Sequence, residues 1–112
     1  MPVHYSISLP DPGTARGNDP RLAFTANGAE AFAEQLQQAL RTPELFERWK
    51  ATQDEPDDVD PALGVTDPEA TVSGKQSDLR IDLVAITRIP GDVLKQRLRL
   101  LAGHHWELRD VR

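Results

Sequence analysis

Residues 3–9 (VHYSISL) alternate between apolar and polar side chains. A period of two places successive side chains on opposite faces of an extended chain, so this segment is predicted to be a strand with one buried face. Pro10 ends the strand, because proline has no N–H to donate to a neighbouring strand. Residues 10–20 (PDPGTARGNDP) are rich in turn-forming residues and are predicted to form an irregular loop.

Helical spacing replaces this alternation after Asn27. Asn27 and Glu30 have the spacing of a capping box, in which two side chains bond the free N–H groups at a helix start. The segment 28–41 is therefore predicted to be a helix. Its apolar stripe comprises Phe32, Leu36, Ala39 and Leu40. The Thr-Pro pair at 42–43 favours a second helix, with threonine as its cap and proline in its first turn, which ends near Lys50.

A second clear alternation covers residues 79–86 (LRIDLVAI). Four residues at alternate positions define its predicted inner face: Leu79, Ile81, Leu83 and Ala85. Val84 and Ile86 make the far end apolar on both faces, which is typical of a strand inside a sheet.

A third helix is predicted to begin at 90–92 (PGD) and to end at Gly103, a residue suited to the left-handed conformation that follows many helices. Its apolar stripe comprises Val93, Leu94, Leu98, Leu101 and Ala102. Its basic residues are predicted to belong to its exposed side, the middle one projecting away from the other two: Lys95, Arg97 and Arg99. Trp106 and Leu108 then alternate with charged neighbours in a last strand.

This order of elements predicts an α+β fold, a two-layer sandwich of a mainly antiparallel sheet with helices on one face, in the ferredoxin-like (split βαβ) topology. The second strand has two candidates, Leu22–Thr25 and Thr71–Ser73, the latter followed by a turn at Gly74–Ser77. A length of 112 residues fits a single domain, 1–112. Its core is expected to include Leu36, Ile81, Leu83, Leu98 and Trp106.

Residues 52–70 (TQDEPDDVDPALGVTDPEA) contain seven acidic residues, three prolines and no basic residue. Such a composition buries too little apolar surface to order a chain, so we predict a long exposed loop, more mobile than residues 10–20. Charge is also uneven along the chain. Residues 1–74 carry 5 basic and 13 acidic side chains, whereas residues 75–112 carry 8 basic and 5 acidic ones, a pattern that favours a polarised surface.

Composition excludes several functional classes. The net charge of −5 argues against general nucleic-acid binding, since neutralisation of phosphates dominates that affinity. The sequence has no cysteine, which excludes thiol chemistry and disulfides and fits a reducing compartment. It also has no run of about 18 apolar residues, so neither a membrane span nor a membrane partner is expected. A soluble, cytoplasmic chain is predicted.

Histidine and acidic residues are the candidate metal ligands. His105 and Glu107 would share one face of the last strand, but two ligands are too few for a stable zinc site. His4 is expected opposite Asp110, far from His105, so the histidines do not converge. The acidic run at 54–60 lacks the central glycine and terminal glutamate of an EF-hand loop. No metal or other cofactor is predicted, and neither a nucleophile motif nor a phosphate-binding loop is present.

The sheet face opposite the helices is expected to be mixed polar and β-branched, without the exposed aromatic residues on which RNA bases stack. Its predicted residues are His4, Ser6, Ser8, Arg80, Asp82, Val84, Ile86, His105, Glu107, Arg109 and Val111.

These patterns favour a non-enzymatic protein-interaction or accessory module that binds another protein through this face or through the acidic loop. The candidate partner-binding residues are Asp54, Glu55, Asp57, Asp58, Asp60, Arg80, Asp82, His105, Glu107 and Arg109. The alternative is a small-ligand or metal-responsive regulatory domain that forms a homodimer through its sheet. A small enzyme using His105 and Glu107 is the third hypothesis.

Overall fold

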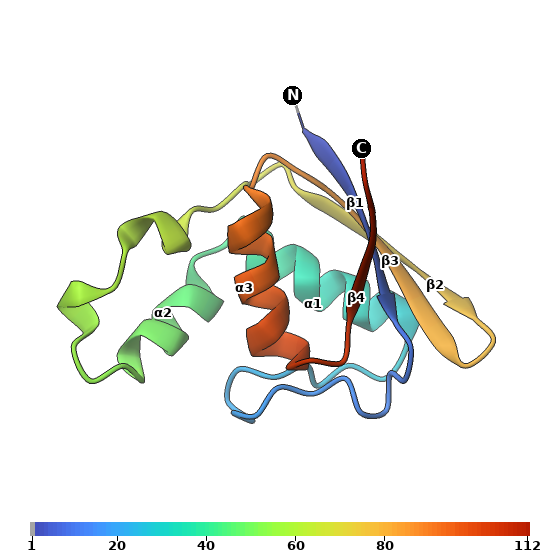
Figure 1. The fold of residues 1–112 in the computed structure, drawn as a ribbon, viewed down its shortest axis with the longest axis horizontal. Coiled ribbons are helices and arrows are strands. Elements are labelled where there is room, and N and C mark those ends of the chain that lie inside the picture. The colour runs from blue at the N-terminus through green and yellow to red at the C-terminus, as the bar shows by residue number, and fades with distance from the viewer. Residues whose placement is uncertain (1) are drawn as a thin grey trace.

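Four strands form one antiparallel sheet in the order β2-β3-β1-β4 in the computed structural model, which describes residues 2–112 (Figure 1). Their bounds are Val3–Leu9 for β1, Thr71–Ser77 for β2, Arg80–Thr87 for β3 and Glu107–Val111 for β4. The first strand of the chain therefore lies between β3 and β4, which both come from its C-terminal third. The complete four-stranded sheet therefore joins segments that are far apart in the sequence.

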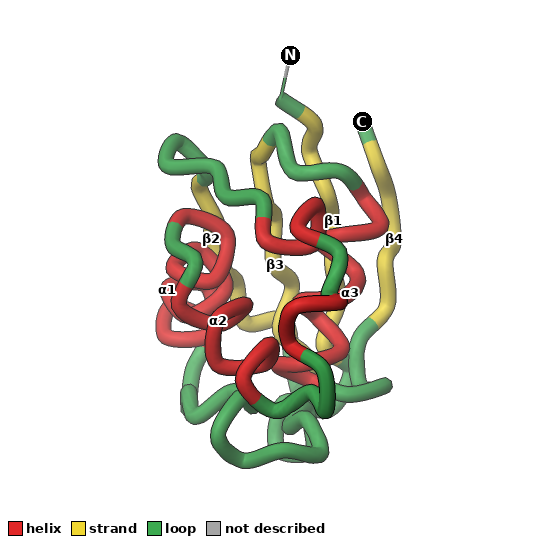
Figure 2. The backbone as a smooth tube through the Cα atoms, turned by 90° about the vertical axis from the view of Figure 1, so that its left-hand side faces the viewer, coloured by secondary structure: helices red, strands yellow, loops and turns green. Residues whose placement is uncertain are grey.

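Three helices lie on one face of this sheet (Figure 2). Their bounds are Ala29–Arg41 for α1, Glu44–Ala51 for α2 and Gly91–Ala102 for α3. The predicted α+β class, the antiparallel sheet and the one-sided placement of the helices are confirmed. Across residues 2–112, each helix is too short or too polar to cross a bilayer.

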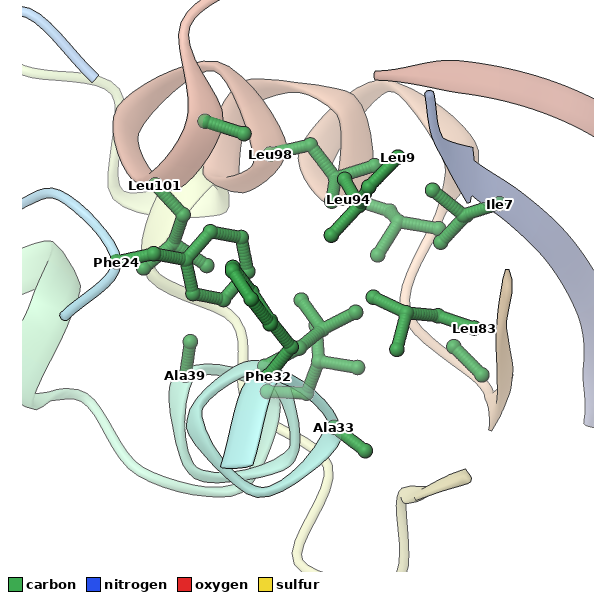
Figure 3. Close-up of a cluster of buried hydrophobic side chains, with 14 of the residues drawn as sticks. Ile7, Leu9, Phe24, Phe32, Ala33, Ala39, Leu83, Leu94, Leu98 and Leu101 are labelled. Carbon is green, nitrogen blue, oxygen red and sulfur yellow. The ribbon is translucent and has the colours of Figure 1, made fainter. Parts of the chain in front are cut away.

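The core fills the space between the helices and the inner face of the sheet (Figure 3). Phe24 and Phe32 meet edge to face with ring centroids 4.9 Å apart, an arrangement that aromatic rings prefer. The predicted core residues Leu36, Ile81, Leu83 and Leu98 are all buried, as predicted. Trp106 is only half-buried; it packs against the core, and its indole N–H donates to the carbonyl oxygen of Gly103.

The second strand is β2, and it is longer than the predicted Thr71–Ser73. The turn predicted at Gly74–Ser77 is wrong, because these residues continue the strand and pair with β3. Contacts from α1 hold both parts of this strand. In the predicted part, the N–H of Val72 donates to Oε1 of Gln37 at 3.0 Å. A Cβ at Gly74 would collide with the carbonyl oxygen of Ala29, so glycine allows the start of α1 to approach the strand. The other candidate, Leu22–Thr25, is not a strand.

The β2–β3 turn differs from the sequence prediction. Leu79 was predicted to face the core, but it lies in this turn and is 87% exposed. The strand begins one residue later, at Arg80, and Asp78 adopts a positive φ of 55° to close the turn. Aspartate tolerates this left-handed conformation better than most residues. The remaining predicted inner residues of β3 are buried.

The helix starts also differ from their predicted caps. The capping box of Asn27 and Glu30 does not form, since Gly28 is the N-cap of α1 and no side chain bonds its first N–H groups. The side chain of Gln35 instead reaches back from α1 and accepts from the N–H groups of Thr25 and Ala26, each at 2.9 Å. At α2, proline is the N-cap and the predicted Thr42 cap is absent. The hydroxyl of Thr42 instead donates to the preceding helix. Gly103 ends α3 with a positive φ of 65°, in line with its prediction.

Residues 52–66, here called the acidic arm, extend from the end of α2 away from the sheet (Figure 1). The arm contains two short 3-10 turns, Pro56–Asp58 and Pro61–Gly64. Its five predicted carboxylates at 54–60 are exposed, as predicted. The prediction of an exposed loop is wrong for Asp67 and Ala70, which are buried and anchor the chain before β2. The greater mobility of this segment stays a prediction.

We predict that Leu83→Ala lowers the free energy of unfolding by about 2–5 kcal/mol, because it removes a fully buried side chain and leaves a cavity. Leu79→Ala, the matched change at the exposed turn next to the same strand, is expected to cost less than about 0.5 kcal/mol. Urea denaturation of both variants measures the difference. Equal losses at the two positions would contradict the assignment of the inner face.

Candidate functional site

The sheet face opposite the helices, here called the open face, is not covered by any segment of residues 2–112 (Figures 1 and 2). The strand register arranges its side chains in rows that cross the sheet from β2 to β4. The first row is Lys75, Asp82, Ser8 and Glu107. The second row is Ser73, Val84, Ser6 and Asp110. The third row is Thr71, Ile86, His4 and Arg112, the last two being joined through their backbones.

The middle of the open face carries no charge. This neutral centre consists of Ser6, Thr71, Ser73, Val84 and Ile86. Val84 and Ile86 are half-buried although no segment of residues 2–112 lies over them, because neighbouring strands shield their flanks. Ser8 is only 3% exposed, since its short side chain lies between the longer Asp82 and Glu107 of the two neighbouring strands.

Charged residues flank the neutral centre on the β4 side and at the end of the face that carries Lys75, Arg80 and Asp82. Most of them are paired within their own strand. The guanidinium of Arg80 is 3.2 Å from Asp82. On β4, Nη1 of Arg109 is 2.7 Å from Oε2 of Glu107. Just beyond this pair, Nε of Arg112 is 2.6 Å from Oδ2 of Asp110. Pairs as exposed as these contribute little to stability. Their effect is to neutralise the rim of the face, apart from Lys75, which forms no ion pair with any residue from 2 to 112.

A β-bulge in β4 changes the predicted composition of this face. Ile7 pairs with Leu108 but Ser6 pairs with Asp110, so Arg109 is the extra residue of the bulge. Asp110 therefore lies on the open face. Val111 pairs with Tyr5 on the helix side, and its prediction as an open-face residue is wrong. The same shift places Ser6, in place of the predicted His4, opposite Asp110.

The predicted pairing of His105 with Glu107 on one strand face is also wrong. His105 is exposed and precedes β4, which begins at Glu107, because the chain is still turning away from α3 at this point. His4 lies on the open face, in the row farthest from Glu107. Within residues 2–112, no three side chains of the metal-ligating types come together in an arrangement able to hold an ion.

Apart from His105, which precedes β4, the predicted partner-binding residues thus fall into two separate groups. Arg80, Asp82, Glu107 and Arg109 belong to β3 and β4. The five carboxylates are on the acidic arm, which Figure 1 shows beyond α2, on the far side of the helices from the sheet: Asp54, Glu55, Asp57, Asp58 and Asp60. None of these five forms an ion pair with a residue of the described part of the chain.

The acidic arm is fastened to the helices by Arg97, which is only 1% exposed. Its Nη2 donates to the carbonyl oxygens of Leu63, at 3.0 Å, and of Val65. Its Nε and Nη1 have no hydrogen-bond partner within residues 2–112. Burial lowers the pKa of this guanidinium below its usual range, and no carboxylate offsets the cost of removing the charge from water.

Sequence reasoning placed Arg97 on the exposed side of its helix, and this prediction is wrong. The signal that identifies it is its spacing: Arg97 is four residues after Val93 and four before Leu101, both of which face the core. The arginine therefore lies within the apolar stripe, and its long side chain passes through the interior to the arm. The arm's turn also contacts α2 closely, because a Cβ at Gly64 would lie 2.7 Å from the ring of Phe46.

Asp67 fixes the chain where the acidic arm returns to the sheet. Its Oδ2 accepts from the hydroxyl of Thr87 at 2.8 Å and from the N–H of Arg88 at 2.9 Å. Its Oδ1 accepts from the N–H of Glu69 at 3.1 Å. The N–H of Arg88 is the main reason that the pKa of Asp67 is below its ordinary value. These bonds explain why an aspartate from the acidic segment is buried, which its composition did not predict.

A groove of about 490 Å³ lies between α1, the start of α2 and residues 20–26. Its walls include alanine and leucine side chains and the polar residues Glu34, Gln38 and Thr42. Its two arginines are already paired, Arg21 with Asp19 and Arg48 with Glu44. Sequence reasoning did not predict this groove, because it depends on the approach of a loop to two helices.

The chain was compared with protein-family models, curated proteins and solved structures. No protein-family model, no curated protein and no solved structure matches the chain.

We predict that Arg97→Met releases the arm while the sheet stays folded. Methionine fills a similar apolar volume but cannot bond the two carbonyl oxygens, and hydrogen bonds to a charged group contribute about 1.5–3 kcal/mol each. Amide hydrogen exchange of residues 61–66 is expected to become at least about tenfold faster, with no change in β1 and β3. Unchanged exchange in the arm would show that Arg97 does not hold it.

Proposed function

We propose that this chain is a non-enzymatic protein-interaction module that binds a protein chain through the open face. The observation that supports this is the neutral centre with a polar rim, whose charges lie on the β4 side and at the end that carries Lys75, Arg80 and Asp82. Protein interfaces have the same layout, with few charges in the middle and a polar, solvated rim. A flat surface with β-branched residues at its middle, left uncovered by the only helices described, suits contact with another flat surface better than a small ligand.

The distribution of titratable groups supports a non-enzymatic role. Active sites gather groups with shifted pKa values in one cleft. Among the described residues, those with a shifted pKa are dispersed, and each has a local structural cause: Tyr5, Asp19, Arg21, Asp67 and Arg97. Tyr5 illustrates this, since burial raises its pKa and its hydroxyl donates to the carbonyl oxygen of Ile89.

The proposed architecture is the ferredoxin-like, split βαβ one. Two features of the chain support it. The paired central strands β1 and β3 each lead through helix to an edge strand, β1 to β2 and β3 to β4. The additional helix α2 and the acidic arm lie in the first of these connections. This architecture leaves one sheet face without helices, which is the condition that the proposed function requires.

The test is Val84→Asp, which puts a carboxylate at the neutral centre. In an affinity capture from lysate with the tagged chain, the parent protein is expected to retain a partner that this variant loses by at least about tenfold. The physical reason is that an unpaired charge buried in an interface costs several kcal/mol, and each 1.4 kcal/mol is a factor of ten in affinity. Ser73→Arg, at an exposed position of the same face, is expected to lose the same partner.

Val65→Asp is the matched control, because Val65 is exposed on the acidic arm and the change is chemically identical. It is expected to retain the partner. Circular dichroism of each variant confirms the fold. If Val65→Asp loses the partner and Val84→Asp retains it, the interface is on the arm and the proposal is wrong. If all variants retain it, the open face is not the binding surface.

A further inference from the structure

The open face is self-complementary when it meets its own copy about one particular axis. We propose that its partner is a second copy of this chain, packed sheet to sheet about a two-fold axis that runs parallel to the strands between β3 and β1. This inference rests on the proposed function and names the partner. Sheets that pack face to face keep their strand directions within about 30° of each other, which this axis satisfies.

The axis reverses each row of the open face against itself. Position by position, β2 of one copy faces β4 of the other, and β3 faces β1. In the first row Lys75 faces Glu107 of the second copy, and Asp82 faces Ser8. In the second row the facing pairs are Ser73 with Asp110 and Val84 with Ser6. In the third row they are Thr71 with Arg112 and Ile86 with His4.

Side-chain size matches in this arrangement. On the open face, Val84 and Ile86 form a ridge along β3, whereas Ser6 and Ser8 form a shallow strip along β1. The two-fold axis places Val84 of each copy over the short Ser6 of the other, at the centre of the contact, and places Ile86 over the side chain of His4. The two β-branched side chains would thus be covered without collision with their own copies, which is the interdigitation that packed sheets require.

Charge also matches in this arrangement. Lys75 is the rim cation without an ion pair within residues 2–112, and it faces the carboxylate of Glu107, twice in the dimer because of the symmetry. Asp110 faces the hydroxyl of Ser73, and Asp82 faces the hydroxyl of Ser8, both of which can donate hydrogen bonds. In none of these rows do like charges face each other.

The other two-fold axis in the plane between the faces, across the strands, gives a poor match. It would place each strand over its own copy. Val84 would then meet Val84 as ridge against ridge, Asp82 would lie over the apolar Ile86, and Asp110 would face its own copy. Facing carboxylates repel each other, and a carboxylate buried against an isoleucine has no partner for its charge.

The area of the open face limits the affinity of this contact. The four strands are about 4.8 Å apart and about seven residues long at about 3.3 Å per residue, which gives a flat area on the order of 400 Å² per copy. Contacts of this size belong to the small, transient class of interfaces. We therefore expect a weak, reversible dimer, further weakened by salt because the Lys75–Glu107 contacts lie at its rim.

The test exchanges the charges of the facing pair. Lys75→Glu alone gives two carboxylate pairs in its homodimer, and Glu107→Lys alone gives two ammonium pairs. Each is expected to raise the dissociation constant about tenfold, since two surface pairs of up to about 1 kcal/mol each become repulsive. An equal mixture of the two variants restores both opposite-charge pairs in the heterodimer. Sedimentation equilibrium of the mixture is expected to return the dissociation constant to within about threefold of the parent value.

Lys50→Glu and Glu30→Lys, which make the same charge changes on the helix side, serve as the matched control pair and are expected to leave the parent association unchanged. Parent protein that stays monomeric up to about 1 mM would overturn the inference. So would a mixture that associates no better than its components. If the mixture fails while Val84→Asp still loses a captured protein, the proposed function stands and its partner is a different chain.

Discussion

Burial of one face of the sheet against α1 and α3 is the interaction on which the rest of the structure depends. Ile7 and Leu83, on adjacent central strands, meet Leu36 from α1 and Leu98 from α3, and all four are almost completely removed from water. Because a strand alternates its side chains, the same burial fixes which residues point away from the helices. The open face is therefore a direct consequence of the core, and the apolar part of its neutral centre, Val84 and Ile86, lies on the central strand β3.

A buried arginine of α3 ties the acidic arm to the same core. Arg97 occupies a position in the apolar stripe of α3, and its guanidinium reaches the carbonyl oxygens of Leu63 and Val65. Asp67 then ties the returning chain to the end of β3. The five carboxylates of the arm are thus carried on a segment fixed at its C-terminal side, on the opposite side of the helices from the open face (Figure 1). The acidic arm and the charged rim of the open face are therefore held in place by different residues.

Local patterns of the sequence were sufficient to predict most helices and strands, but not the turns, helix ends and strand pairings that connect them. Period-two alternation identified β1 and most of β3, and the apolar stripe identified α3, because both depend on neighbours in the sequence. The capping box at Asn27 does not form, because Gly28 is the N-cap of α1 and the helix begins after it. Gly74 belongs to a strand because a distant helix start approaches it. For the candidate site, β1 and β3 were placed correctly except for Leu79, but the bulge at Arg109 depends on pairing with another strand and changed the far end of β4.

The central claim is that the covered face of the sheet is structural and the open face binds a second copy of this chain. Methyl NMR spectra recorded on dilution from about 1 mM to about 10 µM test it most directly. The account predicts that the methyl signals of Val84 and Ile86 on the open face shift with concentration, while those of Leu83 and Leu98 in the core do not. Shifts confined to the helix side, or no concentration dependence at any methyl group, would contradict it.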